Sequence, residues 1–316
     1  MISLRIICLM ASLFTVSRAT ISSFRYIAKL ELDNKMSNEE LVGQHKAHSL
    51  SECAAICQRD CGIFGYNPTL KKCRTHKKTF TSGMSDENGW RYYFPEFLPS
   101  DCKAHRANGY DKSDAYDIYP YGIKSIPVKV HCNMDIMGGG WTAIQKRFDG
   151  SISFDRNWTD YKNGFGEPEQ EVWIGNDVIH QLTKENTSSL YVTITLQNGT
   201  TLYEMYDGFS VSSEAGKYQL FLAGPATGTL GVSMLDTGYP NNFDLSGMSF
   251  STPDRDNDGY SYGNCAAHYR GGWWYNDCHS AFLNGPWSPE SWSWPWFPTV
   301  ENGTSVKGTT VMIRRH

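Results

Sequence analysis

The residues with the clearest chemical capability gather in the segment 250–279. Asp254, Asp256 and Asp258 fall there at every second position, and Gly259 follows them. Alternate carboxylates on a tightly turned backbone converge on one point, and a high density of hard oxygen ligands favours Ca²⁺ over softer metals. The spacing therefore predicts a calcium loop. A solvated acidic turn is the alternative, because Asp, Asn and Gly are also common turn residues.

This loop does not have the spacing of an EF-hand. An EF-hand needs a bidentate Glu at position twelve of the loop, and counting from Asp254 that position is Cys265. Gly, Tyr and Ser residues surround the aspartates where an EF-hand has helices. The sequence therefore predicts a calcium loop of another kind.

The sequence gives little support for an enzyme. It contains no H-E-x-x-H and no phosphate-binding glycine loop, and its G-x-S-x-G match at residues 259–263 lies in the acidic turn and not at the strand-to-helix turn that this motif needs. His279 is the only histidine with a defined chemical setting, and no Ser or Cys nucleophile accompanies it. We therefore expect a binding protein, not an enzyme, with Ca²⁺ as its cofactor.

The elements that position these residues belong to a chain of 316 residues, a length that allows about two domains. Hydrophobic residues make up 40%, enough for a buried core, and the net charge of −4 gives no reason to expect a nucleic-acid partner. The only basic cluster consists of Lys71, Lys72, Lys77 and Lys78. A solvated hairpin explains this cluster better than a nucleic-acid or heparin site does.

Residues 1–19 have the pattern of a secretory signal peptide. Arg5 supplies a positive start, residues 6–16 form an apolar run, and residues 17–19 (Ser-Arg-Ala) match a small-x-small cleavage site. A membrane span needs about 20 apolar residues, so this run is too short, and no other segment reaches that length. We expect a secreted, extracellular protein without a transmembrane segment.

Cysteine usage agrees with export. Of the nine cysteines, Cys8 lies in the signal peptide, and the even number that remains predicts disulfide bonds. Zinc is a less favoured alternative, because the usual C-x-x-C pairs are missing. Acceptor sites for N-glycosylation occur at Asn157, Asn186, Asn198 and Asn302.

The N-terminal part of the mature chain is predicted to be a small α+β domain, a helix on a hairpin. Ser49 and Glu52 form a capping box for a helix over 50–58. A strand over 63–66 and a return strand ending at Cys73 follow it. Such a domain is too small to be stabilised by core burial alone, which explains its cysteines.

The stretch SLSECAAIC…CGIFGYNPTLKKC resembles a PAN/apple module, which we place over residues 20–97. The resemblance implies a Cys53–Cys73 bond and a Cys57–Cys61 bond. Modules of this type bind proteins or sugars, and nothing in these residues says which ligand, if any, this one takes. A purely structural role stays open.

A second domain is predicted over residues 98–316. The junction is short, without a Gly/Ser linker, a collagen repeat or a heptad stretch that would support oligomerisation. Most of the domain is rich in loops. The predicted elements are a tight turn at Gly138–Gly140, a helix over 177–182, and strands over 143–145, 190–196 and 218–222.

This domain resembles the fibrinogen C-terminal domain of ficolins, tachylectins and fibrinogen. The matching stretches are CNMDIMGGGWTAIQKRFDGSISFDRNW, YKNGFGEPEQEVWIGNDVIHQLT, FSTPDRDND, NCAAHYRGGWWYNDCH and LNGPW. The resemblance implies a loop-rich fold with a central mixed or antiparallel sheet. It also implies a Cys102–Cys132 bond and a Cys265–Cys278 bond.

The resemblance also implies a ligand set for the calcium ion. Asp256 and Asp258 match its side-chain ligands, and the carbonyls of Tyr260 and Tyr262 match its backbone ligands. The stretch from Asp258 to Cys265 is one residue longer than is usual in the family. The carbonyl ligands could therefore shift to a neighbouring residue.

Beside this calcium site, the lectin-like members of the family have a pocket for acetyl groups. Tyr269 and His279 match residues of that pocket, with Trp274 as support behind them. The peptide bond between Asp277 and Cys278 matches one that is cis in the family. In that form it directs the backbone N–H groups of Cys278 and His279 towards the acetyl carbonyl.

The segment after LNG departs from the family. Residues 286–297 are shorter than the corresponding loop of the lectin-like members and rich in tryptophan. An acetyl methyl group needs an aromatic enclosure. We therefore expect Trp292, Trp294 or Trp296 to supply the missing wall of the pocket.

Two binding functions follow from the resemblance. The main prediction is a calcium-dependent lectin of innate immunity that binds acetylated sugars of microbial surfaces. The alternative is an adhesion or signalling ligand that uses the same domain for contacts with extracellular proteins, as in angiopoietins and tenascins. Tyr269 with His279 favours the lectin, and the altered segment 286–297 supports the alternative.

Overall fold

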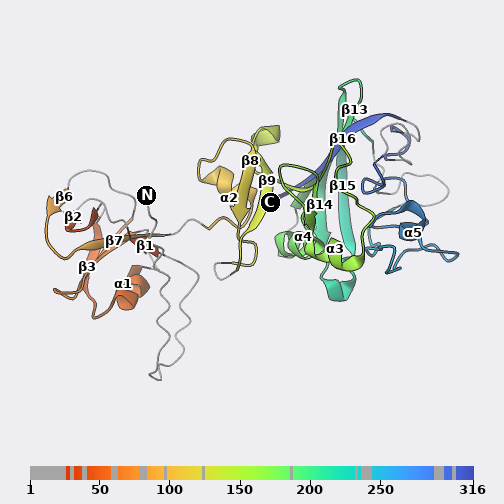
Figure 1. The fold of residues 1–316 in the computed structure, drawn as a ribbon. Helices are drawn as coiled ribbons and strands as arrows, with labels where there is room; N and C mark the ends of the chain where they lie inside the picture. The colour runs from red at the N-terminus through yellow and green to blue at the C-terminus, as the bar shows by residue number, and fades with distance from the viewer. Residues whose placement is uncertain are drawn as a thin grey trace. The chain divides into compact units, whose positions relative to one another are not determined.

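The computed structural model describes residues 26–28, 32–37, 41–57, 63–77, 84–95, 98–122, 125–185, 188–231, 234–235, 244–287, 295–300 and 304–316. The chain divides into two compact units, one that ends at Leu98 and one that begins at Pro99 (Figure 1). The predicted signal peptide lies outside the described residues. No helix among the described residues is long and apolar enough to cross a membrane.

The first unit is built on a five-stranded sheet with the order β1-β7-β4-β5-β3, in which all neighbours are antiparallel. Its strands are β1 (Tyr26–Ala28), β3 (Leu41–Lys46), β4 (Ile63–Asn67), β5 (Lys72–His76) and β7 (Arg91–Pro95). A separate pair joins β2 (Lys35–Ser37) to β6 (Met84–Asp86). The sheet is larger than the predicted hairpin. The sequence analysis missed β1, β3 and β7, because these strands show little apolar alternation.

Helix α1 (Leu50–Cys57) begins with a variant of the predicted capping box, in which the Glu52 side chain reaches the residue before the cap. The N–H of Glu52 donates to the hydroxyl of Ser49 at 3.1 Å, and the Glu52 carboxylate accepts from the N–H of His48 at 2.7 Å. A disulfide bond joins Cys53 to Cys73. The return strand β5 does not end at Cys73 as predicted but continues to His76. The Cys57–Cys61 bond implied by the resemblance involves Cys61, which lies outside the described residues.

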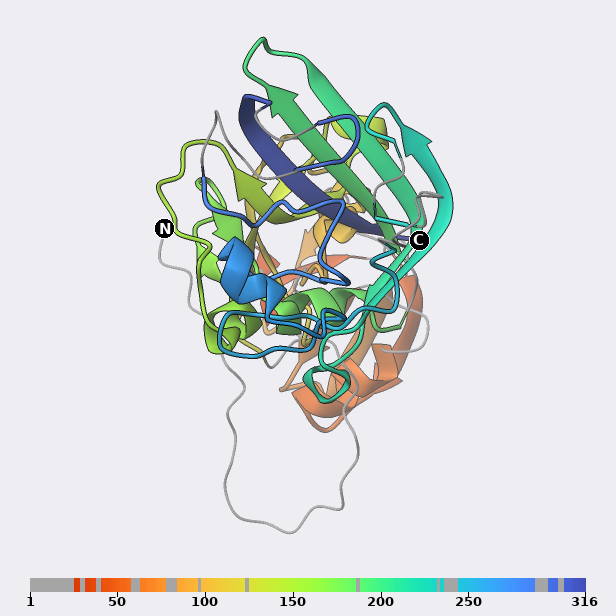
Figure 2. The ribbon, with the colours of Figure 1, turned by 90° about the vertical axis from the view of Figure 1, so that its right-hand side faces the viewer.

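The second unit is mostly sheet. Nine antiparallel strands follow the order β11-β12-β10-β16-β13-β14-β15, with β9 and β8 added beside β10. The strands are β8 (Asp114–Ile118), β9 (Val128–Asn133), β10 (Trp141–Arg147), β11 (Phe165–Gly166), β12 (Val172–Trp173), β13 (Ser188–Leu196), β14 (Thr201–Val211), β15 (Leu220–Gly228) and β16 (Val306–Arg315). In Figure 2 the dark-blue strand β16 runs beside the long green strands.

Four short α-helices accompany this sheet in the described part of the unit. They are α2 (Cys102–Ala107), α3 (Trp158–Asn163), α4 (Asn176–Thr183) and α5 (Cys265–Tyr269). Helix α4 and strands β10 and β13 contain the segments predicted for them. The strand predicted over 218–222 begins only at Leu220, because Lys217 and Tyr218 have φ values of 58° and 48°.

An aromatic core joins the sheet to the loops. The rings of Trp173, Phe250 and Trp274 lie with centroids between 5.2 and 6.1 Å apart. All three side chains are buried, and the core includes buried residues from 102 to 313. Disulfide bonds join Cys102 to Cys132 and Cys265 to Cys278, the pairs that the resemblance implied. Because Phe250 and Trp274 belong to the segment 244–287, this core holds that segment against the sheet.

The acceptor sites for glycosylation are described only in part. Asn157 and Asn198 are exposed. The side chain of Asn157 also caps α3, where it accepts from the N–H of Asp160 at 2.9 Å. Asn186 and Asn302 lie outside the described residues.

Candidate binding site

The acidic turn and the aromatic segment that follows it are held together by backbone contacts and a disulfide bond. Ser251 and Trp273 exchange two backbone hydrogen bonds of 2.9 and 3.1 Å. The N–H of Gly259 donates to the carbonyl of Asn276 at 3.0 Å. The Cys265–Cys278 bond joins the C-terminal end of the acidic turn to the end of the aromatic segment. The loop 254–264 is therefore anchored to the segment 273–278 near both of its ends and at Gly259.

The three aspartates of the turn have different roles. The carboxylate of Asp254 accepts from the N–H of Trp158 at 2.9 Å and from the hydroxyl of Thr252 at 2.7 Å. It therefore ties the turn to the start of α3. Only Asp256 and Asp258 are left as a pair of neighbouring carboxylates.

Asp256 and Asp258 lie close enough to interact directly. The Asp256 carboxylate accepts from the N–H of Asp258 at 3.2 Å, and the two Asp258 oxygens accept from the N–H groups of Tyr260 and Cys265 at 2.9 and 2.8 Å. Burial and the neighbouring Asp256 carboxylate raise the pKa of Asp258, although the two N–H donors oppose this. A cation beside the pair offsets the same repulsion.

The donor set suits a hard cation but includes only two acidic side chains. Among the described residues, no three His, Cys, Asp or Glu side chains come together to hold a metal ion. A calcium ion at Asp256 and Asp258 therefore depends on backbone carbonyls such as those of Tyr260 and Tyr262. Each carboxylate oxygen that accepts one N–H keeps a further lone pair for a metal.

The same loop presents two tyrosine rings to solvent. Tyr262 is 90% exposed and Tyr260 is 37% exposed, and their ring centroids are 5.8 Å apart in an edge arrangement. Most large aromatic side chains of this unit are buried. An aromatic pair on an anchored loop is a preformed contact surface, because little further ordering is needed when a partner binds.

His279 is enclosed by aromatic rings. Its side chain is 8% exposed, and its ring centroid lies 4.5 Å from that of Tyr269, 5.0 Å from that of Phe282 and 5.9 Å from that of Tyr275. Neither ring nitrogen has a hydrogen-bond partner in the described part of the protein. Burial lowers the pKa of His279 to about 3. The imidazole is therefore neutral at physiological pH and has a donor and an acceptor without partners.

Among the other residues that sequence reasoning assigned to the pocket, Tyr269 is half-buried beside His279. The peptide bond between Asp277 and Cys278 is cis. Trp274 is buried in the core, and its indole N–H donates to the carbonyl of Tyr218 at 2.7 Å. Its supporting role stays a prediction. Tyr275 and Phe282 contact His279 directly, and the sequence reasoning missed both.

One of the three tryptophans considered for the pocket wall lies in the core. Trp296 is fully buried, and its indole N–H donates to the carbonyl of Gly231 at 2.8 Å. Its backbone pairs with Ala281 and Val300. Trp296 is therefore part of the core. Trp292 and Trp294 lie outside the described residues.

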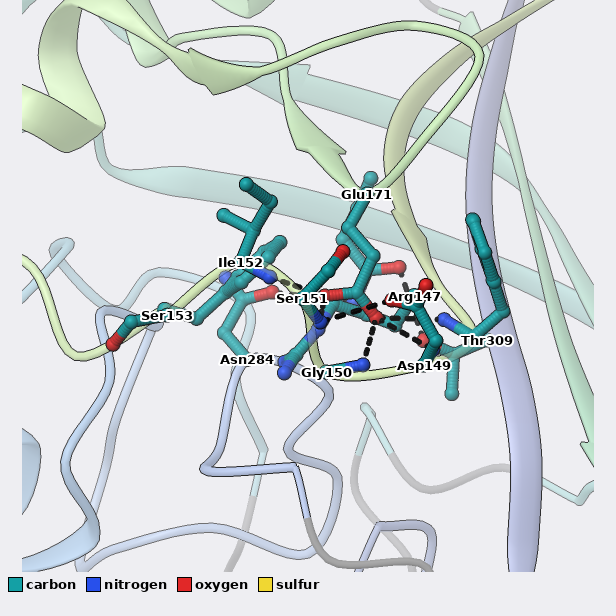
Figure 3. Close-up of polar contacts among 12 residues, drawn as sticks. Arg147, Asp149, Gly150, Ser151, Ile152, Ser153, Glu171, Asn284 and Thr309 are labelled. Atoms are coloured by element: carbon teal, nitrogen blue, oxygen red, sulfur yellow. Dashed lines mark hydrogen bonds and ion pairs between the residues drawn. The ribbon is translucent and has the colours of Figure 1, made fainter.

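A network of buried polar side chains of β10 holds the backbone of residues 283–285 (Figure 3). The amide of Gln145 donates to the carbonyl of Leu283 at 2.8 Å, and the guanidinium of Arg147 donates to that of Gly285 at 2.9 Å. The Asn284 amide in turn donates to the carbonyl of Gly272 at 3.0 Å. The sheet thus positions Gly272 and residues 283–285, which lie before and after His279 in the chain.

Glu171 completes this network. Its carboxylate accepts from the N–H groups of Phe148, Asp149, Gly150 and Ile152 at 2.8 to 3.2 Å. It also lies 3.7 Å from Arg147, and both side chains are buried (Figure 3). Sequence reasoning missed this network. The available signal was Gln145 and Arg147, polar residues at alternate positions of a strand whose first four residues are mostly apolar.

Comparisons with known proteins agree with this geometry. A model of the C-terminal globular domain of fibrinogen beta and gamma chains matches residues 98–315. Human fibroleukin is 40% identical over 227 residues, which cover 68% of this chain and 51% of fibroleukin. Bovine angiopoietin-4 is 41% identical over 192 residues, which cover 61% of this chain and 36% of the relative. The protein thus spans about half the length of the curated relatives it matches, or less.

Solved structures give the same result for the fold. The fibrinogen-like globe domain of human ANGPTL6 is 34% identical with a TM-score of 0.61, and the match covers 69% of this chain and 96% of that domain. Lamprey fibrin D-dimer, solved in complex with the peptide ligand Gly-His-Arg-Pro-amide, is 33% identical with a TM-score of 0.61. That match covers 69% of this chain and 73% of the lamprey protein.

These comparisons overturn the main functional prediction. The lectin prediction took ficolins and tachylectins as its models, whereas the similarity leads to fibroleukin, angiopoietin-4 and the ANGPTL globe domains. The ligand in the lamprey fibrin structure is a peptide, not a sugar. The prediction of a lectin for acetylated sugars is therefore wrong, and the alternative of protein contacts is the better one.

Proposed function

This protein belongs over residues 98–315 to the family of C-terminal globular domains of fibrinogen beta and gamma chains, and from that membership we propose that its second unit is the protein-contacting part of an extracellular adhesion or signalling ligand. The proposed activity is binding, and no reaction is assigned to it. The relatives supply the class of function, and the anchored loop 254–264 supplies the contact surface.

The exposed tyrosine pair is the observation that carries this proposal. Tyrosine is enriched among residues that dominate binding energy at protein interfaces, because one ring covers much area at a small entropy cost. Tyr262 is 90% exposed on a loop that is anchored by the Cys265–Cys278 bond. A residue with that exposure adds nothing to the core, whereas it offers a partner an aromatic anchor.

The aromatic enclosure of His279 is the second part of the proposed surface. The half-buried ring of Tyr269 lies at its edge. Both nitrogens of the neutral imidazole are buried and have no partner among the described residues, so a peptide N–H or carbonyl reaches them only if the enclosing side chains move. The peptide bound to the related lamprey fibrin supports a peptide ligand here.

We propose in addition that Asp256 and Asp258 hold a calcium ion with the carbonyls of Tyr260 and Tyr262. When bound, the ion neutralises the two carboxylates. The backbone ligands belong to the exposed tyrosines themselves, so ion binding restricts the loop that presents them. Affinities of extracellular calcium modules are about millimolar, which matches an ion that strengthens an already anchored loop.

The proposals for the rest of the protein rest on its sequence and disulfides. We propose that the first unit is a PAN/apple-like module, on the basis of the Cys53–Cys73 bond between α1 and β5. Export is supported by disulfide bonds in both units, which persist in oxidising compartments. The exposed Asn157 and Asn198 are the described sites where attached glycans are expected.

The test is binding of the purified full-length protein to animal cell surfaces at physiological salt with millimolar calcium. Tyr262→Ala is compared with Tyr121→Ala, a tyrosine of the same unit that is 48% exposed and outside the site. We expect Tyr262→Ala to weaken binding by roughly tenfold, as for an interface hot spot, and Tyr121→Ala to leave it unchanged. Protease treatment of the cells should remove the binding.

Two results argue against the proposal. If binding survives protease treatment of the cells, the receptor is not a protein. If Tyr262→Ala and Tyr121→Ala bind alike, the loop 254–264 is not the contact surface. Circular dichroism of both variants checks that neither substitution changes the fold.

A further inference from the structure

The first unit carries a pair of like charges at a position where they oppose folding. In the antiparallel pairing of β3 with β5, Lys46 lies directly opposite Lys72. Side chains at opposed positions leave the sheet on the same face with their Cβ atoms about 4.5–5.5 Å apart, and like charges there destabilise the sheet. Both lysines are exposed. Their pairing therefore does not serve the stability of the strands.

Two further cations extend this pair into a row. Lys71 precedes Lys72 in the turn that joins β4 to β5, and its φ of 52° is unusual for a residue with a side chain. Its carbonyl accepts from the N–H of Ala47 at 2.9 Å, which fixes the turn beside the end of β3. Arg74 lies two residues beyond Lys72 and hence on the same face of β5, with its guanidinium carbon 5.2 Å from the ring centroid of Trp90.

Three of the acidic side chains described in this unit have partners other than the three lysines. Asp33 pairs with Arg91 at 2.6 Å, Asp86 pairs with Lys35, and the Glu52 carboxylate caps α1. Within the described ranges, no ion pair reaches the three lysines of the row. The described part of the unit thus gathers the three lysines without an ion pair to any of them.

We propose that Lys46, Lys71 and Lys72 form a binding site for a linear sulfated polysaccharide, with Arg74 at its inner end. The lysine ammonium groups act as point charges for sulfate, and binding releases the counterions that otherwise surround the row. A bound polyanion offsets the repulsion between Lys46 and Lys72. This inference concerns the first unit and does not depend on the protein contacts proposed for the second.

Other polyanions fit the site less well. A single-stranded nucleic acid needs exposed aromatic rings for its bases, and Trp90 on this face is almost fully buried. Attraction to an anionic membrane uses clusters of about four to eight basic residues, and three exposed lysines fall short of that. Both alternatives are outcomes of the test.

The test measures retention of the full-length protein on immobilised heparin over a range of salt concentrations. The variant is Lys46→Gln with Lys72→Gln. The matched control is Lys112→Gln with Lys129→Gln, two exposed lysines of the second unit that lie near Asp114 and Asp117. We expect the first variant to bind roughly tenfold more weakly at physiological salt and to lower the slope of log K against log salt by about two, while the control binds like wild type.

Stability gives an independent readout. Lys46→Gln with Lys72→Gln removes both opposed charges, so it should raise the melting temperature of the free protein or leave it unchanged, and added heparin should raise the melting temperature only where the three lysines are intact. Equal losses of retention in the two double variants overturn the proposal, because the binding is then a property of net charge. Equal retention of wild type on N- and O-desulfated heparin, or binding to phosphatidylserine vesicles or single-stranded DNA in preference to heparin, also overturns it.

Discussion

The ring of His279 lies edge-on against that of Tyr269, with centroids 4.5 Å apart and planes at 74°. Neither nitrogen of His279 has a partner among the described residues. The fold therefore buries a titratable group and offers it nothing that stabilises its charged form. This relationship has consequences for both stability and binding.

Stability should fall in acid because of His279. Burial lowers its pKa in the folded state to about 3, whereas the unfolded protein takes up the proton near the ordinary value of about 6.5. The contribution of neutral His279 is complete above pH 6.5 and is lost as the pH falls from there towards 3. The slope due to this residue is at most about 1.4 kcal/mol per pH unit.

Urea denaturation of wild type and His279→Phe at pH 7 and pH 4.5 measures this effect. Phe fills the aromatic enclosure without unpaired nitrogens, so the loss between the two pH values should be smaller by roughly 2 kcal/mol in the variant. The exposed His268 is the control, and His268→Gln should keep the wild-type pH dependence. An unchanged pH dependence in His279→Phe contradicts the prediction.

Calcium should stabilise the folded protein through Asp256 and Asp258. At an ion concentration ten times a millimolar Kd, ligand binding adds about 1.4 kcal/mol, which raises Tm by a few degrees. Asp256→Asn with Asp258→Asn should abolish the shift. Asp254→Ala should lower Tm with and without calcium, because it removes the acceptor of the Trp158 N–H. It should keep the rise in Tm that calcium causes. If Asp254→Ala loses the shift and the double variant keeps it, the ligand assignment is wrong.

Glu171 should be among the most sensitive positions in the second unit. Glu171→Ala leaves four N–H groups and the buried Arg147 without their carboxylate. Removal of one member of a buried ion pair costs about 3–5 kcal/mol. Denaturant titration should show that loss, whereas the exposed Glu169→Ala should change stability by less than about 0.5 kcal/mol. Similar stabilities of the two variants refute this account.

Gly139 should tolerate no side chain. Its φ is 77°, and a Cβ there comes within 2.5 Å of the carbonyl oxygen of Met134. Gly122 has a φ of 85° but no atom within 4 Å of an added Cβ, so Gly122→Ala measures the conformational cost alone. That cost is about 1 kcal/mol. Gly139→Ala should be destabilised by clearly more, and equal thermal stabilities of the two variants rule out the steric explanation.

Local signals predicted much of the secondary structure. The capping signal of Ser49 and Glu52 located α1, and the apolar pattern of residues 190–196 located β13 except for its first two residues. Such signals depend only on neighbouring residues. The fibrinogen-like fold itself came from long matches in order, and the family comparison confirms it.

Contacts between distant residues could not be predicted in the same way. Asp254 belongs to the same alternating triplet as Asp256, but its separate role depends on Trp158, which is 96 residues away. Trp296 was one of three tryptophans considered for the pocket wall, and its hydrogen bond to Gly231 places it in the core. The pairing of Lys46 with Lys72 is likewise a matter of strand register, which a cluster of lysines in the sequence does not reveal.

The position of β16 has a consequence for biosynthesis. This strand is the last of the sheet to leave the ribosome, yet it pairs with β10 on one side and β13 on the other. Until residues 306–315 emerge, the earlier strands form two separate groups with unpaired edges, β8 to β12 and β13 to β15. We therefore expect the nascent second unit to depend on chaperones until residues 306–315 have emerged, and ribosomes stalled before residue 306 to carry it in a protease-sensitive form.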